Sequence, residues 1–186
     1  FGFLRGDFSW YKNDGNGNFK KKVIKSIPGA IKAYAEDVNK DGNMDIWALF
    51  GQANEGISLF TNKGNGQFEE KKIVSFPPVY GSNDFELADM NNDGIMDIIY
   101  SCGDNGDYSQ VLKPYHGMYI FINDGNNNFK KKYFFLMYGC YKTMSKDFDN
   151  DGDLDVAGIS YFADFDNQPQ ESFIYLKNIG GLQFIP

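Results

Sequence analysis

The chain has 186 residues and a formal net charge of −7, with 25 acidic against 18 basic residues. This balance argues against a nucleic-acid-binding protein, because such proteins need basic surfaces that neutralise phosphates. No apolar run reaches the length of about 18 residues that a transmembrane helix requires, so membrane insertion is not expected.

The first predicted element is a β-hairpin that ends at Phe19. The stretch SWYKNDGNGNF joins an aromatic run to an Asn-Asp-Gly turn, which is typical of two antiparallel strands. The same order of apolar run, turn and phenylalanine returns in SLFTNKGNGQF, IFINDGNNNF and IYLKNIGGLQF, which end at Phe68, Phe129 and Phe184. The chain is therefore expected to repeat one structural unit.

A second repeated element alternates with the hairpins and is rich in aspartate. The pattern D-x-[DN]-x-D-G-x-x-D occurs as DVNKDGNMD from Asp37, DMNNDGIMD from Asp89 and DFDNDGDLD from Asp147. Carboxylates at alternating positions repel one another unless a cation lies between them, and glycine at the sixth position permits a sharp turn. The third stretch therefore predicts a calcium loop formed by Asp147, Asp149, Asp151, the Asp153 carbonyl and Asp155.

Each Asp-rich stretch is expected to join two strands. The outgoing strands are predicted at residues 46–50, 98–101 and 156–160, and each is followed by a third strand, a hairpin turn and a fourth strand. Four short strands in about 50 to 60 residues match the size of one β-propeller blade. The predicted fold class is all-β, built from four-stranded antiparallel meanders.

The Asp-rich loop, followed by a strand and an N-x-G-x-G-x-F hairpin, resembles the FG-GAP or VCBS-type repeat. That repeat forms integrin alpha-subunit propellers and occurs in secreted bacterial and fungal proteins, some of them lectins. The resemblance implies a β-propeller with three calcium ions, one in each loop. It carries the first ligand set onto Asp37, Asn39, Asp41, Asn43 through its carbonyl and Asp45. It carries the second onto Asp89, Asn91, Asp93, Ile95 through its carbonyl and Asp97.

The repeats divide the chain into a partial blade and three calcium-bearing blades. The partial blade is expected at residues 1–28, and the blades at residues 29–78, 79–138 and 139–186. About three and a half blades are fewer than the four to eight that close a ring. We therefore expect a segment of a larger propeller, or one completed by other chains.

An insertion in the second unit is the candidate ligand loop. Residues 103–117 lie between its second and third predicted strands, and long loops on rigid scaffolds are frequent binding sites. Tyr108, Tyr115 and His116, with Asp104 and Asp107, are candidates for contacts to a sugar or a protein. The alternative is that this loop, like the shorter one at residues 162–172, only covers one end of its blade.

Cysteines and lysines carry weaker signals. Cys102 and Cys140 are expected on the face away from the calcium loops, and a disulfide between them is left open. The lysine runs at residues 20–22, 71–72 and 130–132 follow the hairpin phenylalanines, where lysine protects an exposed outer strand from aggregation.

The function expected from these features is that of a non-enzymatic, calcium-stabilised interaction, adhesion or assembly module. The chain contains no G-x-S-x-G elbow, no P-loop and no H-E-x-x-H motif. Because such calcium loops fill where calcium is plentiful, an extracellular, cell-surface or periplasmic location is expected. A protein partner or self-association is the leading hypothesis, and a carbohydrate-binding, lectin-like propeller is the alternative.

Overall fold

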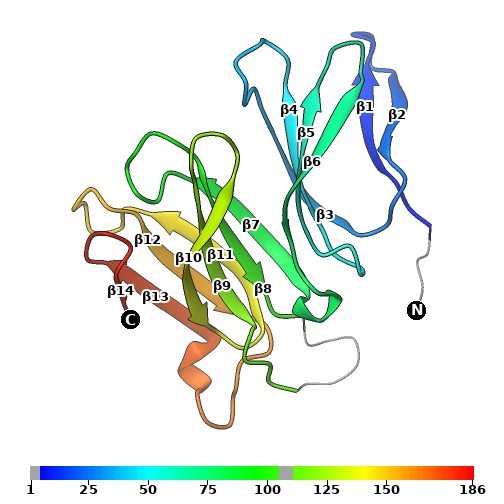
Figure 1. The fold of residues 1–186 in the computed structure, drawn as a ribbon. Coiled ribbons are helices and arrows are strands. Elements are labelled where there is room, and N and C mark those ends of the chain that lie inside the picture. The colour runs from blue at the N-terminus through cyan, green and yellow to red at the C-terminus, as the bar shows by residue number, and fades with distance from the viewer. Residues whose placement is uncertain (1–4, 105–110) are drawn as a thin grey trace. The chain divides into compact units, whose positions relative to one another are not determined.

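The computed structural model describes residues 5–104 and 111–186, and the described residues form antiparallel β-sheets with only two short 3-10 turns (Figure 1). The chain divides into two compact units, Phe1–Pro78 and Val79–Pro186. The expected all-β class is confirmed.

The first unit holds a hairpin and one four-stranded sheet. The hairpin consists of β1 (Phe8–Asn13) and β2 (Phe19–Lys25). The first sheet is a meander whose spatial order follows the chain: β3 (Ala30–Glu36), β4 (Asp45–Phe50), β5 (Gly56–Asn62) and β6 (Phe68–Ser75). Each hairpin turn lies where its Asn-x-Gly sequence predicts it.

The core of the first unit lies between the hairpin and the first sheet. The Phe8 ring of β1 approaches the rings of Phe50 and Phe60 with centroid distances of 5.7 and 5.5 Å. Ala48 is fully buried in the same cluster, and Ile24 of β2 packs against it. A continuous apolar run is typical of a strand buried on both faces, and β4 accordingly buries most of its length.

The second unit holds two four-stranded meanders. The second sheet consists of β7 (Ser82–Ala88), β8 (Asp97–Cys102), β9 (Gly117–Asn123) and β10 (Phe129–Leu136). The third sheet consists of β11 (Cys140–Lys146), β12 (Asp155–Ser160), β13 (Phe173–Asn178) and the short β14 (Phe184–Ile185). The 3-10 turns are η1 (Pro78–Tyr80) and η2 (Pro169–Ser172).

The second and third sheets pack face to face. Ile99, Met118 and Ile120 of the second sheet are buried in one cluster with Val156 and Leu176 of the third sheet. A buried hydrogen bond of 2.9 Å between the hydroxyls of Ser101 and Thr143 joins the same faces. Stacked antiparallel sheets of this kind are compatible with propeller-like blades.

Candidate metal centres

Three loops with the same backbone connect the first and second strands of the three sheets. We call residues 37–45 Asp loop 1, residues 89–97 Asp loop 2 and residues 147–155 Asp loop 3. The fourth residue of each loop, for example Asn150 at φ 64°, has a left-handed conformation. The sixth residue is a glycine with φ between 83° and 96°. A residue with a side chain would be strained in this left-handed region. The spacing of the glycine in the sequence therefore sets the turn.

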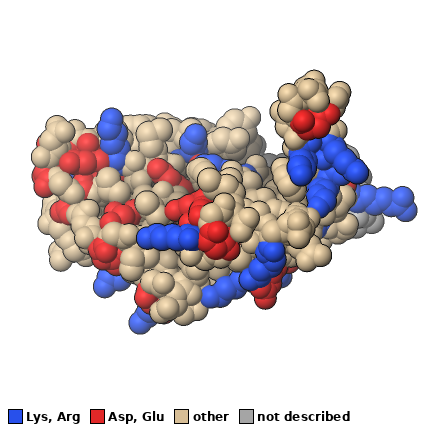
Figure 2. All heavy atoms as spheres, turned by 90° about the horizontal axis from the view of Figure 1, so that it is seen from above, with Lys and Arg blue, Asp and Glu red and all other residues tan. Residues whose placement is uncertain are grey.

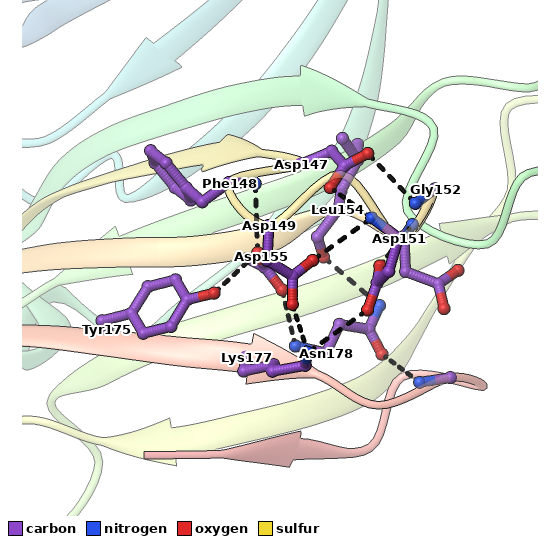
Figure 3. A network of polar contacts seen from close by, with 12 residues as sticks. Asp147, Phe148, Asp149, Asp151, Gly152, Leu154, Asp155, Tyr175, Lys177 and Asn178 are labelled. Carbon is purple, nitrogen blue, oxygen red and sulfur yellow. Dashed lines mark hydrogen bonds and ion pairs between the residues drawn. The ribbon is translucent and has the colours of Figure 1, made fainter.

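The aspartate at the first position holds each turn closed. In Asp loop 3, Oδ1 of Asp147 accepts the Asp151 N–H at 3.1 Å, and Oδ2 accepts the Gly152 N–H at 3.0 Å (Figure 3). Asp37 and Asp89 accept the equivalent pairs of N–H groups in the other two loops. Because each carboxylate oxygen has further lone pairs, this capping leaves it able to ligate a cation.

The aspartate at the ninth position is buried, and its hydrogen bonds join the loop to the third strand of the same sheet. Oδ2 of Asp155 accepts the Phe148 N–H at 3.1 Å, and Oδ1 accepts the Asn178 N–H at 2.8 Å (Figure 3). Asp45 and Asp97 make the equivalent bonds, and all three carboxylates are fully buried. Burial raises the pKa of Asp97, and the N–H groups of Asn123 and Met90 partly oppose this rise.

The residues at the fifth and seventh positions are also held by local bonds. Oδ1 of Asp151 accepts the Asp153 N–H at 3.0 Å. In the other loops, Oδ1 of the aspartate at the fifth position accepts the N–H of Asn43 or of Ile95, in both cases at 2.8 Å. The three residues expected to bind through their carbonyls therefore occupy the same place in every loop.

The donor set fits a calcium ion. Asp147, Asp149 and Asp151 each offer a carboxylate oxygen, and these oxygens lie within 4.8 Å of one another. Oxygens that share a calcium ion lie about 2.3 to 2.6 Å from it, so this spread matches one coordination shell. In the other loops, Asn39 and Asn91 offer an amide oxygen at the third position. Their amide nitrogens donate to Asp41 and Asp93 at 2.9 and 2.8 Å.

Asp loops 2 and 3 contact each other directly. The side-chain nitrogen of Asn92 donates to the Gly152 carbonyl and to Oδ1 of Asp153, both at 3.1 Å. Asn92 is the left-handed fourth residue of its loop, which directs its short side chain toward the neighbouring sheet. The two loops of the second unit therefore form one polar edge.

Three asparagines complete the loops and were missed by the sequence analysis. The side-chain nitrogens of Asn62, Asn123 and Asn178 donate to the carbonyl at the eighth loop position at 3.1, 3.1 and 3.2 Å. Their Oδ1 atoms accept N–H groups from the hairpin glycines. The signal was present in the sequence, because an asparagine stands six residues before every hairpin phenylalanine. Each asparagine joins an Asp loop to a hairpin turn.

The structure places two of the three candidate ligand residues. The side chain of His116 is fully buried, and its backbone N–H donates to the Lys113 carbonyl at 3.0 Å. Burial, aided by the charge of Lys113, lowers the pKa of His116 to about 4. Tyr115 is half-buried and stacks on Tyr80 at a centroid distance of 4.8 Å. Asp107 and Tyr108 lie outside the described residues.

Neither Cys102 nor Cys140 forms a disulfide in the part of the chain that the structure describes. Cys102 ends β8 and Cys140 begins β11, so both lie at the strand ends opposite the Asp loops, as expected. Both side chains are fully buried, and burial raises the pKa of Cys140 to about 12.

A hollow of about 690 Å³ lies beside Asp loop 2, between β10 and the β13–β14 hairpin. Its apolar lining comes from Met90, Ile122, Phe129 and Leu182, and its polar lining includes Asp124, Asp153 and Lys130 to Lys132. The lysines of β10 therefore border this hollow as well as the outer edge of the sheet. Figure 2 shows basic and acidic side chains intermingled over much of one face of the molecule.

Comparison with known protein families identifies the repeat. Residues 37–100 match a family model described as FG-GAP-like repeat. The match begins at the first residue of Asp loop 1 and contains all of Asp loop 2, which confirms the resemblance drawn from these loops. The chain therefore carries FG-GAP-like repeat sequence over these residues. No curated protein matches the chain. Within residues 5–104 and 111–186, no helix has the length and apolar character needed to cross a membrane.

Proposed function

We propose that the chain is a non-enzymatic, calcium-stabilised extracellular module that binds protein through the outer face of its third sheet. The FG-GAP-like match supports a protein-interaction role. The three Asp loops support stabilisation by calcium, and millimolar calcium outside the cytosol supports the location. A second copy of the chain is the partner that we propose to test first.

The observation that carries this proposal is an exposed apolar sheet face. Met144, Ile159 and Phe173 expose 50, 44 and 59% of their surfaces. Ile159 and Phe173 are cross-strand neighbours, and Met144 pairs with Ala157 on the same face. We call these four residues the outer face. Lys142 lies opposite Ile159 on the same face and borders these residues. Exposed apolar patches bordered by polar residues mark interaction sites more often than isolated exposed residues do.

The second sheet shows what covers such a face. By position in the repeat, Ala157, Ile159 and Phe173 correspond to Ile99, Ser101 and Met118. The corresponding residues of the second sheet are at most 1% exposed, and they lie beneath the third sheet. A neighbouring sheet of the same repeat type therefore suits the outer face.

The mass of the particle in solution tests this proposal. We expect light scattering after size exclusion in millimolar calcium to show a dimer or larger assembly that dissociates on dilution. Ile159→Lys with Phe173→Lys should leave a monomer, because lysine cannot be buried there without a partner charge. Val23→Lys, at another exposed apolar residue outside the Asp loops, is the matched control. A monomer of the unaltered chain at every concentration would exclude self-association.

The non-enzymatic part is supported by the location of the acids. Among the described residues, one group of acidic side chains lies close enough together to share a metal ion. It consists of Asp147, Asp149 and Asp151, which belong to Asp loop 3. Acids committed to a cation are poor general acids or bases. Turnover in a broad hydrolase screen, lost on mutation of a carboxylate outside the loops, would contradict this part.

A glycan-binding function is the second candidate, and the hollow beside Asp loop 2 favours it. Its volume of about 690 Å³ lies in the range of ligand sites, and its lining combines apolar and hydrogen-bonding groups. Leu182→Trp should fill the hollow and abolish binding on a glycan array, and Tyr115→Ala tests the aromatic loop separately. An array without any signal would remove this candidate.

A further inference from the structure

Asp loop 3 differs from the other two loops in its charge. Its third position carries Asp149, where the other loops carry Asn39 and Asn91. Its seventh position is also an aspartate, which the other two loops lack, so this loop has five acids against three. The strand beside it also differs, because Lys177 stands one residue before the bracing asparagine, where Thr61 and Ile122 stand in the other sheets. The additional acids and Lys177 occur in the same repeat.

The structure pairs these two residues. The Lys177 ammonium forms an ion pair with Oδ2 of Asp149 and lies 3.5 Å from Oδ2 of Asp151 (Figure 3). The three side chains are only 30 to 38% exposed, so the charges are partly screened from water. In the first sheet, Lys63, which follows the bracing Asn62, pairs instead with Glu69 at 2.8 Å.

A tyrosine on the same strand adds a second difference. The Tyr175 hydroxyl donates to Oδ2 of Asp155 at 2.8 Å (Figure 3). The equivalent positions carry Leu59 and Ile120, which have no side-chain donor. Residues two apart on a strand share a face, so Tyr175 and Lys177 approach the loop together.

We propose that Lys177 partly neutralises Asp loop 3 and that calcium binds there in competition with it. Lys177 supplies positive charge that a bound cation would otherwise supply, and the Tyr175 hydroxyl adds a hydrogen-bond donor to Asp155. Calcium therefore binds Asp loop 3 more weakly than it would without Lys177, and this loop keeps its conformation when calcium is removed. The inference rests on the calcium occupancy proposed above.

A calcium titration of Lys177→Thr tests the competition. Threonine is the residue that the first sheet carries at this position, so the change should be tolerated. Calorimetry should show binding at one site tightened roughly two- to five-fold, the effect expected when a partly exposed ion pair no longer competes. Lys142→Thr, on the same sheet but away from the loop, should change nothing. Unchanged affinity in Lys177→Thr would overturn the proposal.

Melting in a chelator provides a second and independent readout. Lys177→Thr should lower the melting temperature without calcium, because Asp149 and Asp151 lose their counter-charge, and calcium should restore it. Adding Asp149→Asn should cancel most of this loss, because the acid that pairs with Lys177 is then absent. Equal melting of Lys177→Thr and the unaltered chain in chelator would overturn the proposal.

The reciprocal transplant separates this inference from the proposed function. Asn39→Asp with Thr61→Lys gives Asp loop 1 the acid–lysine pair of Asp loop 3 and should bind calcium more weakly there than Asn39→Asp alone. If the unaltered chain binds no calcium at any loop, calcium stabilisation fails as a function. Melting of Lys177→Thr in chelator then still decides whether Lys177 neutralises the loop.

Discussion

The carboxylate of Asp97 accepts the backbone N–H of Asn123 at 2.9 Å, although 26 residues separate them in the chain. The same bond joins Asp45 to Asn62 and Asp155 to Asn178, at 2.8 Å in both cases. Because the asparagine also binds the hairpin turn, loop and hairpin form one braced corner in each sheet. This corner, rather than the loop alone, is the structural unit of the repeat.

Asp97→Asn should destabilise the protein by about 1.5 to 3 kcal/mol, the usual contribution of hydrogen bonds to a charged group. The carboxylate accepts N–H groups on both oxygens, and an amide would direct its own N–H groups at one of these donors. Urea unfolding measures the loss. Asp166→Asn, at an exposed aspartate, is the control and should cost less than about 0.5 kcal/mol. Equal stability of the two variants would contradict the bracing role.

Removal of calcium should lower the melting temperature. A site filled at about 100 times its Kd stabilises by about 2.7 kcal/mol, which corresponds to roughly 5 to 10 °C for a chain of this size. Scanning calorimetry with EDTA and then with excess calcium measures the change, with magnesium as the control ion. An unchanged melting temperature would mean that the Asp loops need no cation.

Acidification should destabilise the protein through His116. The pKa of this side chain is about 4 in the folded chain, against an ordinary value of 6.5, because burial disfavours the charged form. Between these values the unfolded chain binds a proton that the folded chain does not, so stability falls as the pH drops from about 6.5 to about 4. The full loss is up to about 3 kcal/mol.

Comparing His116→Gln with the unaltered chain isolates this effect. The nearby charges of Lys113 and Asp104 remain in both proteins, so the difference in their urea midpoints should depend on pH within this window. Parallel pH profiles of the two proteins would show that folding leaves the pKa of His116 unchanged.

Both thiols should resist modification in the folded protein. Burial raises the pKa of Cys140 to about 12, and Cys102 is equally buried, so neither presents a thiolate to a reagent at neutral pH. A chromogenic thiol reagent should detect both cysteines only after denaturant is added. Detection of none under denaturing conditions, followed by two after reduction, would instead show a disulfide.

The sequence was most informative where structure is determined locally. The position of Gly152 within its loop and the Asn-x-Gly turns are local signals, and the loops and hairpins occur where these signals predict them. The burial of His116 was not predictable, because it depends on how the inserted segment folds back. The pairing of Lys177 with Asp149 also depends on strand register, which joins residues 28 apart.

The brace between loop and hairpin has a consequence for how the repeat can change over evolution. The bracing bond spans 17 residues in the first sheet and 26 in the second, yet its length changes by only 0.1 Å. The additional residues belong to the connection between β8 and β9, which joins the strand ends opposite Asp loop 2. Selection can therefore lengthen, shorten or replace that connection while the corner formed by Asp loop and hairpin is inherited unchanged. New specificities can arise at one end of a blade without disturbing its stability at the other.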